Sequence, residues 1–105
     1  PYFGISMLDI ADSYYLWQNG ITIPEKVTEG VVVIEASKDS PADKAGLKKG
    51  DIIIKLADED ISSLAEFRYE LYKHKVGEKV SVTYIRDNKE KETEVTLEKN
   101  IWKHI

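Results

Sequence analysis

The sequence contains no cysteine among its 105 residues, and it holds only three prolines and six glycines. Without cysteine the chain has neither disulfides nor thiol chemistry, although its compartment stays open because reducing and oxidising locations both tolerate such domains. Long apolar runs are also missing. No stretch approaches the roughly 18 residues that would span a bilayer, and no signal peptide is visible, so we expect a soluble segment.

An excess of positive charge is absent too. Fifteen Lys and Arg stand against nineteen Asp and Glu, which gives a net charge of -4. We therefore expect no nucleic-acid partner, because a phosphate-binding surface needs a positive excess. The length allows one domain over residues 1–105, with its core in residues 1–98 and a tail in residues 99–105. Because the chain begins at Pro1 and not at Met, we expect it to be part of a longer protein.

Residue patterns for catalysis, cofactors and metals are missing as well. His74 and His104 have no carboxylate or cysteine at ligand spacing, so neither predicts a metal site. Residues 4–8 come nearest to a nucleophile elbow but lack its second glycine. Gly46 and Gly50 stand alone, which excludes a phosphate loop or a dinucleotide fingerprint. We therefore expect no enzyme active site and no cofactor in this chain, and a binding module is favoured.

What the sequence does contain is a series of short strands. The apolar residues 2–8 predict a strand entered through a turn at Gly4, where a missing Cβ permits unusual dihedrals. The β-branched run at residues 31–34 predicts a strand buried on both faces. A turn at residues 87–88 predicts a final hairpin. The remaining strands are predicted over residues 52–56, 80–85 and 93–97.

Capping signals predict two helices. Ser40 followed by Pro41 indicates an N-cap and a first helical position. Ser63 and Glu66 have the spacing of a capping box, and apolar residues then recur at helical spacing up to a stop at residues 76–77. Together with the strands, these helices predict an α+β or mainly β class, with a compact and largely antiparallel barrel or sandwich.

Two motifs carry a resemblance to a known family. Residues 40–53 read SPADKAGLKKGDII and resemble the S-P-A-x-x-A-G-L-x-x-G-D-x-I signature of PDZ domains. The opening YFGI at residues 2–5 resembles the carboxylate-binding loop in PDZ domains of bacterial HtrA/DegP-like serine proteases, which are trypsin-like. The resemblance extends over residues 2–98. It implies a PDZ-like, partly open antiparallel β-barrel or sandwich of five to six strands with two helices.

The resemblance also implies a function. A domain of this kind captures C-termini or extended segments of substrate proteins and regulates or feeds an attached serine protease. The implied partners are such peptides and the adjacent protease domain, without membrane contact by this domain itself. The implied location is the bacterial cell envelope or extracellular side, with any membrane anchor outside this chain. Two alternatives remain open: a PDZ domain of another membrane or processing protease, or a non-proteolytic scaffold or assembly module.

The first part of the site implied by the resemblance is a loop followed by a strand. A backbone that turns at Gly4 can direct several N–H groups at one anion, such as a C-terminal carboxylate. The loop residues are Tyr2, Phe3, Gly4 and Ile5. An extended peptide then adds alongside the following strand, whose pairing residues are Ser6, Met7 and Leu8.

The opposite wall is implied to be the second predicted helix. Its groove face combines residues at three-and-four spacing, namely Leu64, Phe67, Arg68 and Leu71. A pocket lined by Phe3, Ile5 and Leu71 predicts an aliphatic or aromatic C-terminal residue in the ligand. Arg68 either meets an acidic or polar side chain two residues upstream of that terminus or simply extends along the helix surface.

Residues 9–30 form a long connection with one predicted helical turn between Asp12 and residues 19–20. Three aromatic residues lie in it: Tyr14, Tyr15 and Trp17. They either form an apolar cluster that pins the loop, or they contact a neighbouring protease domain or partly cover the groove.

Overall fold

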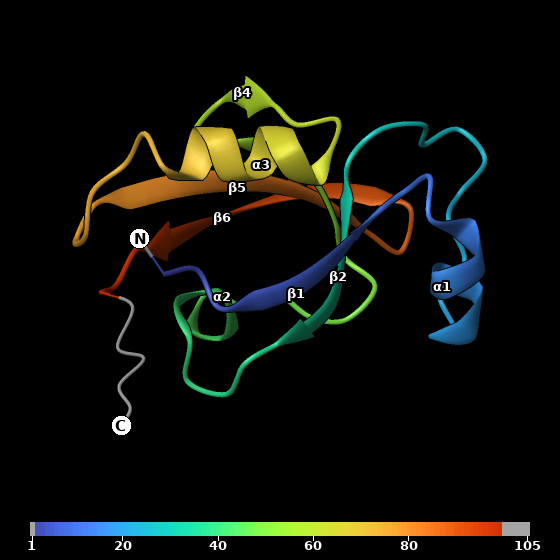
Figure 1. Ribbon diagram of the computed structural model, residues 1–105, viewed down its shortest axis with the longest axis horizontal. Coiled ribbons are helices and arrows are strands. Elements are labelled where there is room, and N and C mark those ends of the chain that lie inside the picture. The colour runs from blue at the N-terminus through green and yellow to red at the C-terminus, as the bar shows by residue number, and fades with distance from the viewer. Residues whose placement is uncertain (1, 100–105) are drawn as a thin grey trace.

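The computed structural model describes residues 2–99. Within them, six antiparallel strands form one sheet in the order β1-β2-β3-β5-β6, with β4 paired to β3 (Figure 1). The strands are β1 (Ile5–Asp9), β2 (Val31–Ala36), β3 (Ile52–Leu56), β4 (Glu59–Asp60), β5 (Lys79–Arg86) and β6 (Lys89–Thr96). The helices are α1 (Ser13–Gln18), α2 (Pro41–Lys44) and α3 (Leu64–Leu71).

The sheet is curled but not closed. Tyr2, just before β1, forms an isolated antiparallel bridge with Glu98, just after β6, and the Tyr2 N–H donates to the Glu98 carbonyl at 2.8 Å. This short bridge brings the two ends of the strand order together without a continuous ladder. The prediction of a partly open antiparallel barrel or sandwich is confirmed, and the predicted helical turn after Asp12 is a third helix, α1.

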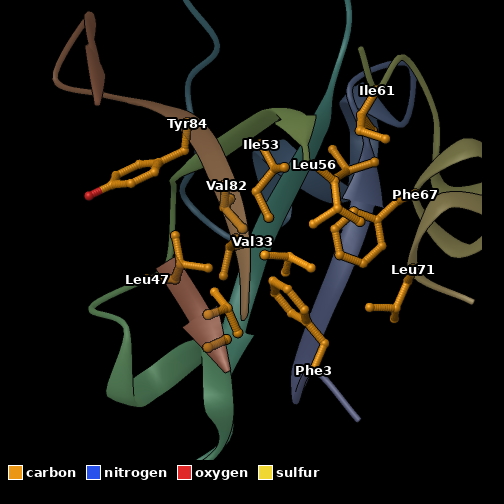
Figure 2. Packing of buried hydrophobic residues seen from close by; sticks show 14 of the residues in the cluster. Phe3, Val33, Leu47, Ile53, Leu56, Ile61, Phe67, Leu71, Val82 and Tyr84 are labelled. Atoms are coloured by element: carbon orange, nitrogen blue, oxygen red, sulfur yellow. The ribbon is translucent and has the colours of Figure 1, made fainter. Parts of the chain in front are cut away.

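The core has two parts, one on each face of β2 and β3. Val31 and Val33 belong to the main core with residues of α3, whereas Val32 faces a second cluster with Leu16 and Ile52. All three valines are fully buried, which confirms the strand predicted to be buried on both faces. Figure 2 shows side chains of the main core converging from the strands, from α3 and from the segments that precede or connect these elements: Phe3, Val33, Leu47, Ile53, Leu56, Ile61, Phe67, Leu71, Val82 and Tyr84.

The final hairpin forms around the predicted turn. Asp87 and Asn88 both adopt positive φ, at 53° and 65°, as a tight two-residue hairpin turn requires. β6 nevertheless begins at Lys89, four residues before the predicted start. The first half of β6 is exposed and charged, so the sequence there has no apolar alternation that would predict a strand. Pairing there continues the ladder from the turn.

A tight turn follows β3 and leads into a short strand. Ala57 and Asp58 both have positive φ in this turn, at 52° and 67°. Beyond it, Glu59–Asp60 pairs with β3 as the two-residue strand β4.

The helix caps follow the sequence in part. The Ser40 Oγ accepts a hydrogen bond from the Asp43 N–H at 3.1 Å, which confirms the predicted N-cap of α2. The Ser63 Oγ likewise accepts from the Glu66 N–H at 3.2 Å. The Glu66 carboxylate, however, accepts from the Ser62 N–H at 2.6 Å, so the reciprocal half of the predicted capping box is wrong. The predicted end at residues 76–77 is also wrong, because α3 ends at Leu71.

Helix α1 has the predicted bounds but not the predicted packing. Leu16 is 2% exposed and joins the second apolar cluster, whereas the three aromatic side chains are exposed by 62%, 56% and 74%: Tyr14, Tyr15 and Trp17. The prediction that these aromatics pin the loop is therefore wrong, and Leu16 anchors it. A helix this short buries one narrow face, and the aromatics lie outside that face.

Candidate functional site

A surface groove separates β1 from α3. It combines the start of the chain with a helix far along the sequence and a residue of the β2–α2 connection. Its lining residues are Tyr2, Phe3, Gly4, Ile5, Ser6, Met7, Ser37, Phe67, Arg68, Leu71 and Tyr72. None of the α1 aromatics is among them, so α1 does not cover the groove.

The loop at one end of the groove is held by its carbonyl groups. The Phe3 carbonyl accepts from the Ala42 N–H at 3.0 Å, and the Gly4 carbonyl accepts from the Ser37 N–H at 2.8 Å. Within residues 2–99, neither the Phe3 nor the Gly4 N–H donates to a backbone carbonyl. The loop therefore has its acceptors occupied and keeps backbone donors for another group, which is the arrangement that suits an anion.

Glycine is required at position 4 for two reasons. Its φ is 86°, in the left-handed region that side chains disfavour. A Cβ there would also lie 2.2 Å from the Cβ of Ser40, the buried N-cap of α2. The loop thus packs directly on α2, so the two motifs that carry the sequence resemblance form a single structural unit.

Strand β1 provides one wall of the groove. It pairs with β2 on one side only, and it ends the order of strands in the sheet. Ile5 and Met7 are half-buried and pack against the main core, while Ser6 is exposed. Leu8 packs into the second cluster and does not line the groove. The free edge of β1 can accept one more strand.

Helix α3 provides the other wall. Phe67 and Leu71 are 1% and 7% exposed and form the apolar base, while Arg68 is exposed above them. Leu64 packs against the main core but does not line the groove. Of the four predicted helix residues, the structure therefore gathers three at the groove.

Two lining residues were missed by the sequence analysis. Tyr72 follows Leu71 and lies four positions after Arg68, so helical spacing could have indicated it. Ser37 has no such signal, because only the pairing of β2 with β1 brings it to the loop.

Within residues 2–99, no three His, Cys, Asp or Glu side chains are grouped so that they could hold a metal ion. In the same part of the chain, no helix has the length and apolar character needed to cross a membrane. His104 lies outside the described residues. His74 is half-buried, and its Nδ1 lies 2.5 Å from a carboxylate oxygen of Glu78.

Comparison with known proteins gives a consistent result. The family model described as PDZ domain matches residues 1–97. The chain is 37% identical over 100 residues to the serine protease Do-like HtrA of Lactococcus lactis subsp. lactis (strain IL1403), covering 95% of this chain and 24% of that protein. It is 39% identical over 101 residues to the serine protease Do-like HtrA of Bacillus subtilis (strain 168), covering 93% of this chain and 22% of that protein. The chain thus spans less than a quarter of the length of these relatives.

Solved structures share the fold. The HtrA-type protease AlgW with decapeptide superposes with a TM-score of 0.77 at 20% identity, covering 91% of this chain and 28% of that chain. The HtrA3 PDZ domain bound to a phage-derived ligand, FGRWV, superposes with a TM-score of 0.72 at 23% identity, covering 91% of this chain and 84% of that chain.

Proposed function

The chain belongs to the PDZ domain family, and we propose that the groove between β1 and α3 binds the C-terminus or an extended segment of another protein. One observation carries the proposal: the free edge of β1 continues directly from a loop whose Phe3 and Gly4 N–H groups have no backbone acceptor within residues 2–99. A peptide adding to this edge gains main-chain hydrogen bonds, and its terminal carboxylate receives the loop amides.

The loop is ready to bind before a ligand arrives. Its carbonyls are fixed by Ala42 and Ser37, and Gly4 is held against Ser40, so little ordering entropy is lost on binding. The loop amides supply the charge recognition, and the edge of β1 supplies affinity that does not depend on the ligand's sequence. A short strand-adding peptide is expected to bind with a Kd on the order of micromolar, or about 8 kcal/mol.

Side chains around the groove set the preference for ligands. Ile5 and Leu71 present apolar surface beside the loop, above the buried Phe3, so an aliphatic or aromatic C-terminal residue is favoured. The phage-derived ligand on the HtrA3 PDZ domain ends in valine, which supports this preference. Arg68 is exposed on the α3 wall and favours an acidic or polar side chain two residues upstream.

The parent protein is proposed to be an HtrA/DegP-like serine protease of the bacterial cell envelope or extracellular side. The names of the relatives support this assignment, and the protease's catalytic residues would then lie outside the present chain. Capture of substrate ends or extended segments by the groove would regulate or feed that protease. A scaffold role without proteolysis, or attachment to another processing protease, would use the same groove.

The test is binding of this domain to a library of peptides with free C-termini, each hit being measured again as its C-terminal amide. We expect apolar-terminal peptides to bind and amidation to weaken them, with chemical-shift changes at β1 and α3. Equal binding of acid and amide would instead assign the groove to internal extended segments. Absence of binding by every peptide would refute the proposed function.

A further inference from the structure

We infer that Asp9 is a positioning residue that fixes α3 against β1 and so keeps the groove at the width a peptide strand needs. The inference rests on the proposed function, since it concerns the same groove. It assigns a role to a side chain that neither lines the groove nor contacts the carboxylate-binding loop.

The observation is a direct bond between the two walls. Asp9 is the last residue of β1, and Leu64 is the first residue of α3. The Asp9 Oδ1 accepts a hydrogen bond from the Leu64 N–H at 2.6 Å. In Figure 1 the end of β1 and the start of α3 lie on the same side of the molecule, away from the start of the chain.

The Asp9–Leu64 hydrogen bond satisfies a backbone N–H group at the N-terminus of α3. The first N–H groups of a helix have no partner within it. Ser63 satisfies the N–H of Glu66, and Asp9 satisfies that of Leu64 from a different element of the fold. A carboxylate at a helix N-terminus also interacts favourably with the helix dipole, and a charged acceptor makes the stronger kind of hydrogen bond.

The shape of the groove agrees with a tie at this end. The lining residues extend along β1 as far as Met7 and begin on α3 at Phe67. Leu8 and Leu64, which lie next to the bond, do not line the groove. The groove is therefore open beside the carboxylate-binding loop, and its two walls are joined at the other end by the Asp9–Leu64 hydrogen bond.

This placement separates two properties of the site. Carboxylate capture depends on the loop, which Ser37, Ser40 and Ala42 hold independently of Asp9. Contact with the ligand's upstream residues depends on the position of α3. Without the bond, the start of α3 would have to be ordered each time a peptide binds, and that cost would lower affinity for acid and amide ligands alike.

The experiment compares Asp9→Ala, Asp9→Asn and Leu64→Pro in peptide binding by calorimetry. Asp9→Ala removes the acceptor, whereas Leu64→Pro removes the donor at the first helical position, where proline is tolerated. Each is expected to weaken binding about tenfold, as the loss of a hydrogen bond to a charged group implies. Asp9→Asn keeps an acceptor oxygen and is expected to restore most of the affinity. Asp12→Ala is the matched control, because the Asp12 side chain makes no cap hydrogen bond.

Two further readouts distinguish positioning from general damage. The ratio of acid to amide affinity is expected to stay at its wild-type value in every variant. Hydrogen exchange of the first α3 amides is expected to accelerate in Asp9→Ala and to slow again when peptide is bound. Three outcomes would overturn this inference while leaving the proposed function intact. They are wild-type affinity in Asp9→Ala, affinity in Asp9→Asn as weak as in Asp9→Ala, and a changed acid-to-amide ratio. If the wild-type domain bound no peptide, the proposed function and this inference would both fail.

Discussion

Phe3 and Phe67 pack edge to face, with ring centroids 5.1 Å apart and ring planes at 89°. Phe3 comes from the loop that precedes β1 and Phe67 from α3, and the two residues are 4% and 1% exposed (Figure 2). The contact places the main core directly beneath the groove. The base of the groove and the stability of the domain are therefore linked.

Truncation of Phe67 is expected to cost both stability and binding. Phe67→Ala removes a buried ring and should lower the free energy of unfolding by about 3–5 kcal/mol, measured by urea denaturation. Tyr69→Ala is the control on the same helix, because Tyr69 is 66% exposed. We expect its effect to stay within about 0.5 kcal/mol. Equal effects of the two changes would contradict the burial seen here.

Gly4→Ala is expected to abolish peptide binding. The new Cβ would meet the Ser40 Cβ at 2.2 Å, so the loop must move. Gly20→Ala is a matched control, because Gly20 also has a positive φ, 73°, but nothing lies within 4 Å of an added Cβ. That control should cost only about 1–2 kcal/mol in stability, the usual penalty for a left-handed residue, and should keep its peptide affinity. Calorimetry and thermal unfolding of both variants would check this.

Arg86→Ala is expected to be strongly destabilising. Asp51 is 1% exposed, and its carboxylate accepts hydrogen bonds from the Arg86 Nε at 2.7 Å and Nη2 at 2.6 Å. This carboxylate raises the pKa of Arg86 above its ordinary value. Among residues 2–99, removal of the guanidinium leaves the buried Asp51 charge with one donor, the Lys48 N–H. The change should cost about 3–5 kcal/mol in unfolding free energy.

Arg86→Lys is the informative companion variant. Lysine keeps the positive charge but cannot donate two parallel hydrogen bonds from one planar group. We expect an intermediate loss in chemical denaturation. If lysine matched arginine, charge alone would account for the pair.

Ionisation of Glu66 is expected to account for part of the change in folding stability with pH. Hydrogen bonds from the Ser62 hydroxyl and then the Ser62 backbone N–H lower the pKa of the Glu66 carboxyl below its ordinary value. Because the Glu66 carboxyl has a lower pKa in the folded state than in the unfolded state, its ionised form stabilises the fold. This stabilisation is complete above the unfolded-state pKa of about 4.3 and is lost as the pH falls through the folded-state pKa.

Glu66→Gln should therefore flatten the fall in melting temperature between neutral and acidic pH, measured by circular dichroism. Glu92→Gln makes the same Glu-to-Gln substitution at an exposed residue of β6 and serves as the control. Identical pH profiles for the wild type and Glu66→Gln would contradict this prediction.

Leu16→Ala is expected to detach the connection between β1 and β2. Leu16 is 2% exposed within the second apolar cluster, so its truncation should cost about 2–5 kcal/mol. Trp17→Ala, at a residue 74% exposed, should leave the melting temperature nearly unchanged. The reverse order of effects would show that the aromatics stabilise the loop after all.

The sequence alone determined the features that depend on neighbouring residues. The run of valines in β2, the Ser40 cap of α2 and the turn at Asp87 and Asn88 all follow from steric and hydrogen-bonding preferences within a few positions. The family motifs belong to this class too, because Gly4 and the residues after Ser40 impose local backbone conformations wherever they occur.

Only the tertiary structure decided how these elements meet. Leu16 is buried while its aromatic neighbours are exposed, and the Asp9 carboxylate accepts a hydrogen bond from the Leu64 N–H across 55 positions. Such contacts depend on which face of a helix packs against the sheet and on how segments far apart in the sequence come together. Local propensity does not encode these distances, so the groove's residues could be proposed from the sequence, but the tie between its walls could not.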